Sequence, residues 1–155
     1  MSGTALLDAR IVVVEDDPRS MRLLERMLAG EGYTDVNGFA DPVEAVEECL
    51  RRPPDLMLLD LRMPGIDGFE VLARLRPADD DDWLPVIVLT AERGGEAKRR
   101  ALSAGAQDYI TKPFDRVEAM LRIRNLLHIH FQHKRLAATN VTLEDIVDQR
   151  RRTHR

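Results

Sequence analysis

Four short segments of the chain are almost continuously apolar, and segments with helical spacing separate them. The apolar runs cover residues 11–14, 56–59, 86–89 and 109–110, and a weaker run covers residues 36–39. Such runs are typical of β-strands covered on both faces. Between them apolar residues recur three or four positions apart, as at Met21, Leu24 and Leu28, which indicates amphipathic helices. The pattern predicts five alternating strand and helix units.

Three of the predicted helices begin with the same pair of acidic residues. The pairs are Asp41 with Glu44, Asp67 with Glu70, and Asp115 with Glu118. The Asp carboxylate can accept hydrogen bonds from the exposed N–H groups of the first turn, and both acids suit the positive end of the helix. Gly32 and Gly105 fall where two helices are expected to end.

Strict alternation of strands and helices predicts an α/β fold with a parallel sheet covered on both faces. Ligands of such folds bind beyond the carboxyl ends of the strands. The polar residues that follow the apolar runs are Asp16, Asp17, Asp60, Thr90 and Lys112. We therefore expect these five side chains to meet at one edge of the sheet.

This set of residues suits phosphoryl transfer assisted by a divalent cation. Carboxylates gathered at one edge repel each other unless a cation intervenes, and Mg²⁺ prefers oxygen ligands. Thr90 and Lys112 suit the oxygens of a transferred phosphoryl group, and Asp60 is the candidate nucleophile because a carboxylate can carry an acyl phosphate. A simpler interpretation is that Asp16 and Asp17 cap the helix that follows them.

Composition limits the classes of protein to which the chain can belong. The 155 residues suffice for one domain and a short appendage, and 44% hydrophobic with 32% charged residues is typical of soluble globular proteins. No apolar run approaches the roughly 20 residues of a membrane-spanning helix, and no signal peptide is apparent, so we expect a cytoplasmic protein without membrane contact. The single cysteine, Cys49, predicts packing and no disulfide.

Charge divides the chain into two modules. Residues 1–115 contain 14 Lys and Arg against 23 Asp and Glu, a net charge of -9, whereas residues 116–155 contain 9 against 4, a net charge of +5. The C-terminal segment therefore differs in character from the rest.

Four motifs resemble the response-regulator receiver domains of two-component systems over about residues 9–133. They are Val14-Glu15-Asp16-Asp17, Leu58-Leu59-Asp60-Leu61-Arg62-Met63-Pro64-Gly65-Ile66-Asp67-Gly68, Leu89-Thr90-Ala91 and Asp108-Tyr109-Ile110-Thr111-Lys112-Pro113-Phe114. The resemblance implies a flavodoxin-like fold: a five-stranded parallel sheet in the order 2-1-3-4-5, five helices, and here an extended last helix. The expected division is an N-terminal extension (1–8), a receiver domain (9–133) and a C-terminal linker or coiled-coil extension (134–155).

The resemblance also implies a role for each acidic residue. Asp60 would accept a phosphoryl group from a sensor histidine kinase or a phosphotransfer protein. Mg²⁺ would be held by Asp60, by Asp17 directly, by Asp16 largely through water, and by the backbone carbonyl of Arg62. Arg62 and Glu92 would face each other across the entrance to Asp60 and tune the lifetime of the phosphorylated state, although two solvated side chains are an equal alternative.

Further residues would sense the phosphoryl group. Thr90 and Lys112 would contact its oxygens, and Thr90 and Tyr109 would act as the switch that reshapes the surface of the fourth and fifth helices and the strand between them. Lys112-Pro113 matches a bond that is usually cis in this family. Such a receiver catalyses its own phosphorylation and dephosphorylation and is not otherwise an enzyme.

The last helix carries a second pattern that predicts a parallel two-stranded coiled coil, and hence a homodimer. Heptad positions a and d would be Leu126, Ile129, His133, Leu136, Asn140, Leu143 and Val147. Residues 139–142 are an alternative interruption, after which Thr142 would cap a new short helix. His128, His130 and His133 match no zinc spacing and are interpreted as exposed helix residues.

Three other functions compete with a switching receiver. A dimerisation or adaptor module of the same fold would leave the acidic site unused. A phosphatase with an aspartate nucleophile would be expected to carry Asp-x-Asp, which Asp60-Leu61-Arg62 lacks. A DNA-binding regulator would need a reading motif, so nucleic acid is not an expected partner of the basic C-terminus. The tail resembles linkers to output domains such as cyclic-di-GMP enzymes or kinases, and the sequence would then be a fragment.

Overall fold

A computed structural model describes residues 6–63, 65, 67–75, 84–91 and 95–153, with side chains up to residue 136. The strands are β1 (Arg10–Val14), β2 (Asp35–Phe39), β3 (Leu56–Asp60), β4 (Val86–Thr90) and β5 (Asp108–Thr111). The helices are α2 (Pro18–Glu31), α3 (Pro42–Arg51), α4 (Gly68–Leu75), α5 (Gly95–Ser103) and α6 (Arg116–Thr153). The predicted alternation of strands and helices is confirmed, including the weak run that forms β2.

All five strands form one parallel sheet in the order β2-β1-β3-β4-β5. This order is the one that the family resemblance implies. Strands β1, β3 and β4 are buried along their whole length, which is why their sequences are apolar except at a terminal residue. The central strand is β3, and Asp60 is its last residue.

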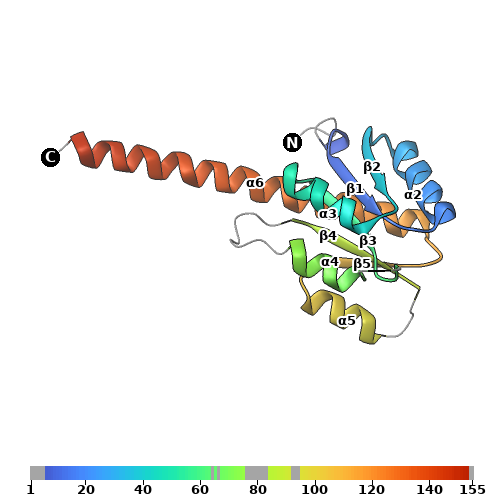
Figure 1. The fold of residues 1–155 in the computed structure, drawn as a ribbon. Helices are drawn as coiled ribbons and strands as arrows, with labels where there is room; N and C mark the ends of the chain where they lie inside the picture. The colour runs from blue at the N-terminus through green and yellow to red at the C-terminus, as the bar shows by residue number, and fades with distance from the viewer. Residues whose placement is uncertain (1–5, 64, 66, 76–83, 92–94, 154–155) are drawn as a thin grey trace.

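Helices cover both faces of the sheet (Figure 1). A separate apolar cluster is buried on each face. On one face, Leu24 and Leu28 of α2 pack with Ile123 and Leu127 of α6. On the other face, the cluster combines side chains of α3, α4 and α5, among them Val46, Leu72 and Ala101. Leu6, from the expected N-terminal extension, packs in the first cluster with 4% of its surface exposed.

Acidic residues cap α3 and α4 as the sequence predicts. Asp41 accepts a hydrogen bond from Val43 N at 2.9 Å, and Asp67 accepts one from Glu70 N at 3.0 Å. Gly32 ends α2 with φ 103°, a left-handed conformation that favours glycine. These caps hold the helix starts at the edge of the sheet where the strands end.

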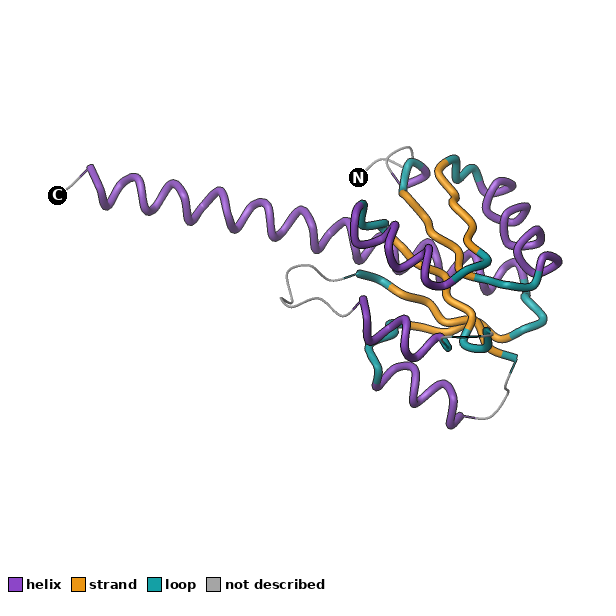
Figure 2. Tube along the Cα trace, viewed as in Figure 1, coloured by secondary structure: helices purple, strands orange, loops and turns teal. Residues whose placement is uncertain are grey.

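Helix α6 is unbroken over 38 residues, and its C-terminal half projects away from the domain (Figure 1, Figure 2). The expected extension of the last helix is confirmed, and the alternative interruption at residues 139–142 is not observed. At 1.5 Å per residue the helix is about 57 Å long. Neither α6 nor any other helix in the described ranges combines the length and apolar character of a membrane span.

Candidate functional site

Polar side chains gather beyond the carboxyl ends of the central strands, as the parallel topology predicts. Asp60 ends β3 and Thr90 ends β4, and both are buried, with 5% and 4% of their surface exposed. Glu15 and Asp16 directly follow β1. Lys112 follows β5, where its N–H donates to Thr90 O at 2.8 Å.

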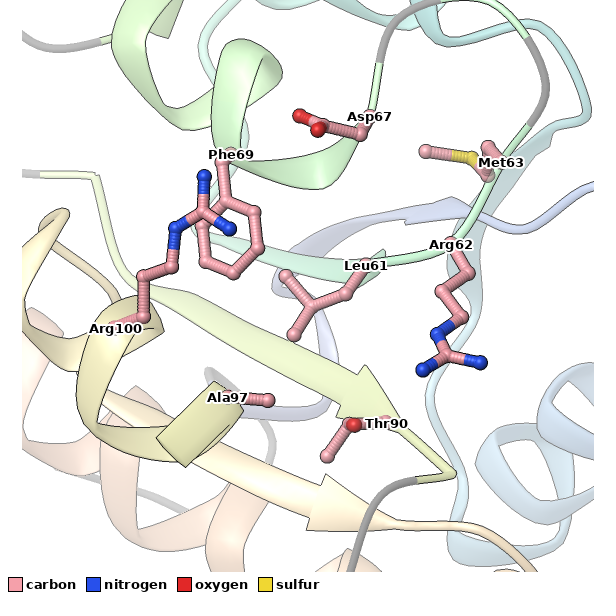
Figure 3. A pocket seen from close by; sticks show the side chains of 8 residues that line it. All are labelled: Leu61, Arg62, Met63, Asp67, Phe69, Thr90, Ala97 and Arg100. Carbon is pink, nitrogen blue, oxygen red and sulfur yellow. The ribbon is translucent and has the colours of Figure 1, made fainter. Parts of the chain in front are cut away.

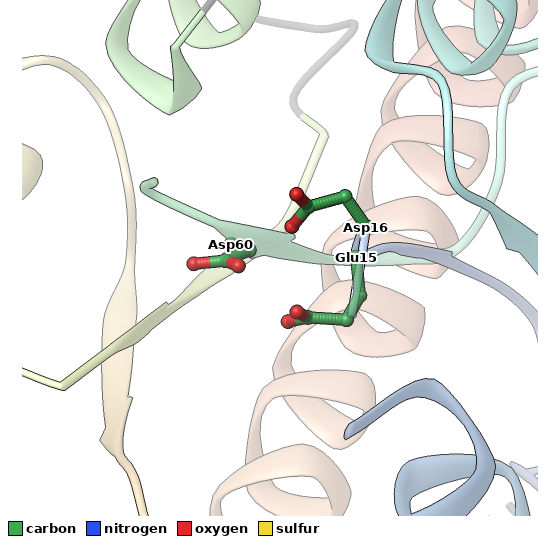
Figure 4. A group of neighbouring side chains, drawn as sticks. All are labelled: Glu15, Asp16 and Asp60. Carbon is green, nitrogen blue, oxygen red and sulfur yellow. The ribbon is translucent and has the colours of Figure 1, made fainter. Parts of the chain in front are cut away.

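Three carboxylates form one acidic cluster at this edge. Glu15, Asp16 and Asp60 each offer a carboxylate oxygen within 4.8 Å of the others (Figure 4). Glu15 is only 1% exposed, whereas Asp16 lies at the surface. Asp60 also accepts a hydrogen bond from Arg62 N at 3.1 Å, which fixes the turn after β3. The acids thus lie close enough to share a single cation.

Asp17, which the resemblance places as a direct metal ligand, lies outside this cluster and has another role. Its carboxylate caps α2 by accepting hydrogen bonds from Arg19 N at 3.1 Å and from Ser20 Oγ at 3.3 Å. The simpler cap interpretation therefore holds for Asp17 but not for Asp16. Sequence reasoning missed Glu15, and the signal for it was its place as the first polar residue after β1.

Lys112 forms ion pairs with two of the three acids and balances part of their charge. Its Nζ lies 3.0 Å from Glu15 Oε2 and 3.3 Å from Asp60 Oδ2. Burial alone would lower the pKa of Lys112, but the hydrogen bond with Glu15 and the charge of Asp60 outweigh burial and raise it. Lys112 therefore keeps its positive charge beside the nucleophile candidate.

Glu15 has an unusual protonation equilibrium. Burial raises the pKa of its carboxyl from 4.5 to about 7, the Lys112 hydrogen bond opposes this, and the charge of Asp60 adds to it. A carboxyl whose pKa is higher in the folded state than in the unfolded state stabilises the fold while it is protonated. That stabilisation is fully present below the unfolded pKa and is lost as the pH rises through the folded pKa. Deprotonated Glu15 thus costs stability unless another cation joins Lys112.

The chemistry of these donors fits magnesium. Carboxylate oxygens are the ligands that Mg²⁺ prefers, and it commonly uses one or two of them beside water and phosphate oxygens. Glu15, Asp16 and Asp60 supply such oxygens, and among the residues that the structure describes no histidine nitrogen or cysteine sulfur belongs to their cluster. The site residues therefore suit a hard cation and a phosphoryl group together.

Thr90 borders a pocket between the turn after β3 and helix α5 (Figure 3). Arg62 lines the pocket near Thr90, and the Arg100 guanidinium stacks on the Phe69 ring, with Cζ 3.9 Å from the ring centroid, on the other side. The expected partner of Arg62, Glu92, lies outside the described residues. Thr90 therefore borders open space at the carboxyl end of β4.

Tyr109 lies half-buried between two cations. Lys98 Nζ of α5 is 4.5 Å from its ring centroid, and Arg122 Cζ of α6 is 5.1 Å from it. Arg122 is itself paired with Asp108 and Glu118. The ring therefore joins α5, β5 and α6, the surface that the resemblance assigns to the switch. The peptide bond between Lys112 and Pro113 is cis, as the resemblance implies.

The predicted coiled-coil residues fall on different sides of α6. Leu126 packs in the domain core with 7% exposed, and His133 is half-buried, whereas Ile129 and Leu136 are 52% and 64% exposed. The side chains of Asn140, Leu143 and Val147 lie outside the described set. The interpretation of His130 as an exposed histidine is wrong, because it is 3% exposed and contacts Asp55, the residue before β3.

Known proteins are similar to the chain in sequence and in fold. The response regulator receiver domain model matches residues 11–124. The transcriptional regulatory protein TcrA of Mycobacterium tuberculosis is 48% identical over 118 residues, which cover 76% of this chain and 45% of TcrA. The chain spans about half the length of the first curated relatives it matches.

Solved structures of related proteins have the same fold as the chain. A response regulator from Chloroflexus aurantiacus superimposes with a TM-score of 0.73 at 35% identity, covering 78% of this chain and 98% of that one. The receiver domain of a sensor histidine kinase from Pseudomonas aeruginosa, solved with a magnesium ion coordinated in its active site cleft, gives 0.70 at 33% identity with the same coverage. The chain therefore belongs to the response regulator receiver domains of two-component systems.

Proposed function

We propose that Asp60 accepts a phosphoryl group from a phosphohistidine of a sensor kinase or phosphotransfer protein. The observation that carries the proposal is the contact of a buried carboxylate at the end of the central strand with both Lys112 and an acidic cluster. In the transfer, an Asp60 oxygen forms a bond to phosphorus, and the phosphorus–nitrogen bond to the donor imidazole breaks. The product is an acyl phosphate on Asp60 and a dephosphorylated donor histidine.

The surrounding residues position the reacting carboxylate and balance its charge. Lys112 holds one Asp60 oxygen, and the N–H of Arg62 holds the other. Mg²⁺ would be held by Glu15, Asp16 and Asp60, together with the backbone carbonyl of Arg62, and would supply neutralisation of the phosphoryl charge. The Thr90 hydroxyl would donate a hydrogen bond to a phosphoryl oxygen. We assign Glu15, in place of Asp17, to the metal site because Asp17 already caps α2.

Intact-mass measurement after incubation with acetyl phosphate and Mg²⁺ tests this proposal. We expect a gain of one phosphoryl group that Asp60→Asn abolishes and that chelation of the metal prevents. Asp16→Asn should weaken the Mg²⁺ dependence, and Asp17→Asn is the matched control that should leave phosphorylation unchanged. Labelling that persists in Asp60→Asn would refute the assignment, and repeated turnover of a phosphoester would favour a phosphatase.

We further propose that phosphorylation moves the Thr90 and Tyr109 side chains. The added charge attracts the Thr90 hydroxyl, and the space it leaves admits the Tyr109 ring, which then leaves Lys98 and Arg122. A shift between two existing states needs about 1 to 3 kcal/mol of differential interaction. Beryllofluoride, a phosphoryl mimic, should perturb the amide spectra of α5, β5 and the start of α6. Unchanged spectra there would support the non-switching adaptor function instead.

Helix α6 supports a proposal about partners. We propose that residues 9–133 act as the receiver and that residues 134–155 join it to a second copy of the chain or to an output domain, such as a cyclic-di-GMP enzyme or a kinase. Partnership with a histidine kinase would place the protein in the cytoplasm. In proteins most helix stability comes from packing of an apolar face rather than from intrinsic propensity, so a partner helix would stabilise this segment. Exposed Ile129 and Leu136 supply the apolar contact.

Sedimentation of the full chain tests the dimer. We expect Leu136→Glu to lower the dimer fraction, whereas Arg135→Glu, a neighbouring exposed position that is not in the apolar stripe, should not. A monomeric parent protein would refute the dimer but leave the phosphorylation of Asp60 untouched, because the two are measured separately.

A further inference from the structure

A second set of polar contacts lies at the opposite edge of the sheet, far from the acidic cluster. Asp55 directly precedes β3 and is half-buried. Its Oδ2 accepts a hydrogen bond from Arg10 N at 2.9 Å, and its own N–H donates to Arg10 O at 2.8 Å. The Asp55 carboxylate is therefore fixed to the start of β1.

The same carboxylate binds two side chains of α6. Its Oδ1 lies 3.1 Å from His130 Nε2 and 3.1 Å from Lys134 Nζ. Because a carboxylate only accepts hydrogen bonds, Nε2 must be the donating nitrogen of His130. His130 and Lys134 are four residues apart and so lie on the same side of the helix. Asp55 thus gathers three donors from two elements.

Charge reinforces these contacts. Burial alone would raise the pKa of Asp55, but the hydrogen bonds from His130, from the Arg10 backbone and from Lys134 outweigh it and hold the pKa well below its usual range. The carboxylate remains charged, and charge-assisted hydrogen bonds are stronger than neutral ones. His130 is only 3% exposed, so its contact with Asp55 is shielded from water.

These contacts differ in kind from the apolar packing of α6. Leu126 and Leu127 hold the helix against the sheet by contacts that have no preferred direction. Hydrogen bonds to one fixed acceptor are directional and define the rotation and the position of the helix along its axis. They also lie near the last turns of α6 that touch the domain, so they set the angle at which the projecting half leaves it.

We propose that Asp55, His130 and Lys134 form a latch that fixes the direction in which α6 leaves the domain. The helix beyond the latch then moves with the receiver as one rigid body. Strand β3 joins the latch directly to Asp60, because Asp55 immediately precedes the strand and Asp60 is its last residue, about 16 Å away at 3.3 Å per residue. The proposal does not depend on the chemistry of Asp60.

Distance measurements between two spin labels on the full chain test the latch. Leu50→Cys in α3 and Leu136→Cys in α6, both exposed positions, carry the labels in a Cys49→Ala background. Dilution with unlabelled protein restricts the measurement to distances within one chain. The parent should give a single narrow distance.

The double variant His130→Leu and Lys134→Met removes both α6 donors and keeps most of their apolar volume. We expect it to lose the single narrow distance and to give a broad or shifted distribution. Arg135→Met is the matched control, because Arg135 is exposed on the same turn and should keep the parent distribution. Phosphorylation of Asp60 by acetyl phosphate should persist in every variant.

Two results would overturn the latch: a parent distribution in the double variant, or equal broadening in Arg135→Met. If circular dichroism shows that the double variant does not fold, Asp55→Asn decides the question. An asparagine can still accept from Arg10 N, but it lacks the charge that holds His130 and Lys134. A narrow parent distance in Asp55→Asn would then refute the proposal.

Discussion

Gly68 begins α4 at the point where this helix touches the backbone that carries Asp60. A Cβ atom at Gly68 would lie 2.8 Å from Leu61 Cα and 2.9 Å from Asp60 O. Gly68 N also donates to Leu61 O at 3.1 Å, so the two segments cannot separate without losing a hydrogen bond. Because the nearest atoms belong to the backbone, Gly68→Ala must displace the end of β3.

The size of the effect follows from two opposing terms. Alanine in place of glycine stabilises a helix position that suits it by about 0.4 to 1 kcal/mol. Overpacking of a tight contact costs about 1 to 3 kcal/mol. Gly95→Ala measures the first term alone, because Gly95 begins α5 and its nearest neighbour would be the Arg99 side chain at 3.7 Å. The difference in stability between the two variants should therefore be about 2 kcal/mol.

Urea unfolding and acetyl phosphate labelling provide the assay. With a slope of about 1 to 3 kcal/mol per molar urea, the midpoint of Gly68→Ala should lie roughly 1 M below that of Gly95→Ala. Labelling of Asp60 should also slow in Gly68→Ala, because its carboxylate moves relative to Lys112. Equal midpoints and equal labelling rates in the two variants would show that the contact between α4 and β3 is looser than described.

Three further predictions concern single side chains. Because the pKa of Glu15 is raised to about 7, the urea midpoint of the Mg²⁺-free protein should fall between about pH 5 and pH 8, and Glu15→Gln should flatten that dependence. Loss of the α2 cap in Asp17→Ala should cost about 1 kcal/mol in urea unfolding while labelling continues. Lys98→Met removes one of the two cations that contact the Tyr109 ring, an interaction of about 0.5 to 1 kcal/mol. Because this contact holds the ring outward, we expect a larger population of the inward ring in NMR spectra recorded without beryllofluoride.

The sequence predicts the sheet well because its strands are buried on both faces. After Arg10 at the start of β1, strands β1, β3 and β4 have no polar residue before their ends, so the length and composition of these apolar runs identify them. The convergence of Asp60, Thr90 and Lys112 follows from the parallel order of the strands, because carboxyl ends share one edge. The apolar character of buried strands, together with the shared edge of their carboxyl ends, thus suffices to predict this half of the site.

The choice between neighbouring acids is a harder problem. Glu15, Asp16 and Asp17 are consecutive, and the residue at which the strand gives way to the helix decides which of them face the site. That residue depends on Pro18, which begins α2 and makes Asp17 its cap. A shift of one position exchanges a metal ligand for a helix cap, and sequence-based boundaries are not accurate to one residue.

The two apolar stripes of α6 explain why the tail was only partly predicted. Ile123 and Leu127 face the sheet, whereas Ile129 and Leu136 face solvent, and both pairs fit helical spacing. A heptad drawn through Leu126 therefore mixes a core residue with exposed ones. Spacing along one helix identifies residues that share a side but not which side meets the domain.

The contact between Asp55 and His130 joins residues 75 positions apart, yet simple geometry could have indicated it. Helix α6 starts near the carboxyl end of β5 and runs back along the sheet. A strand of five residues spans about 16 Å, which a helix covers in about 11 residues at 1.5 Å each. About 11 residues after Arg116, the first residue of α6, the helix therefore reaches the turn that holds Leu127 and His130. A buried polar residue on that turn must find a partner, and Asp55, just before the central strand, lies at the same edge.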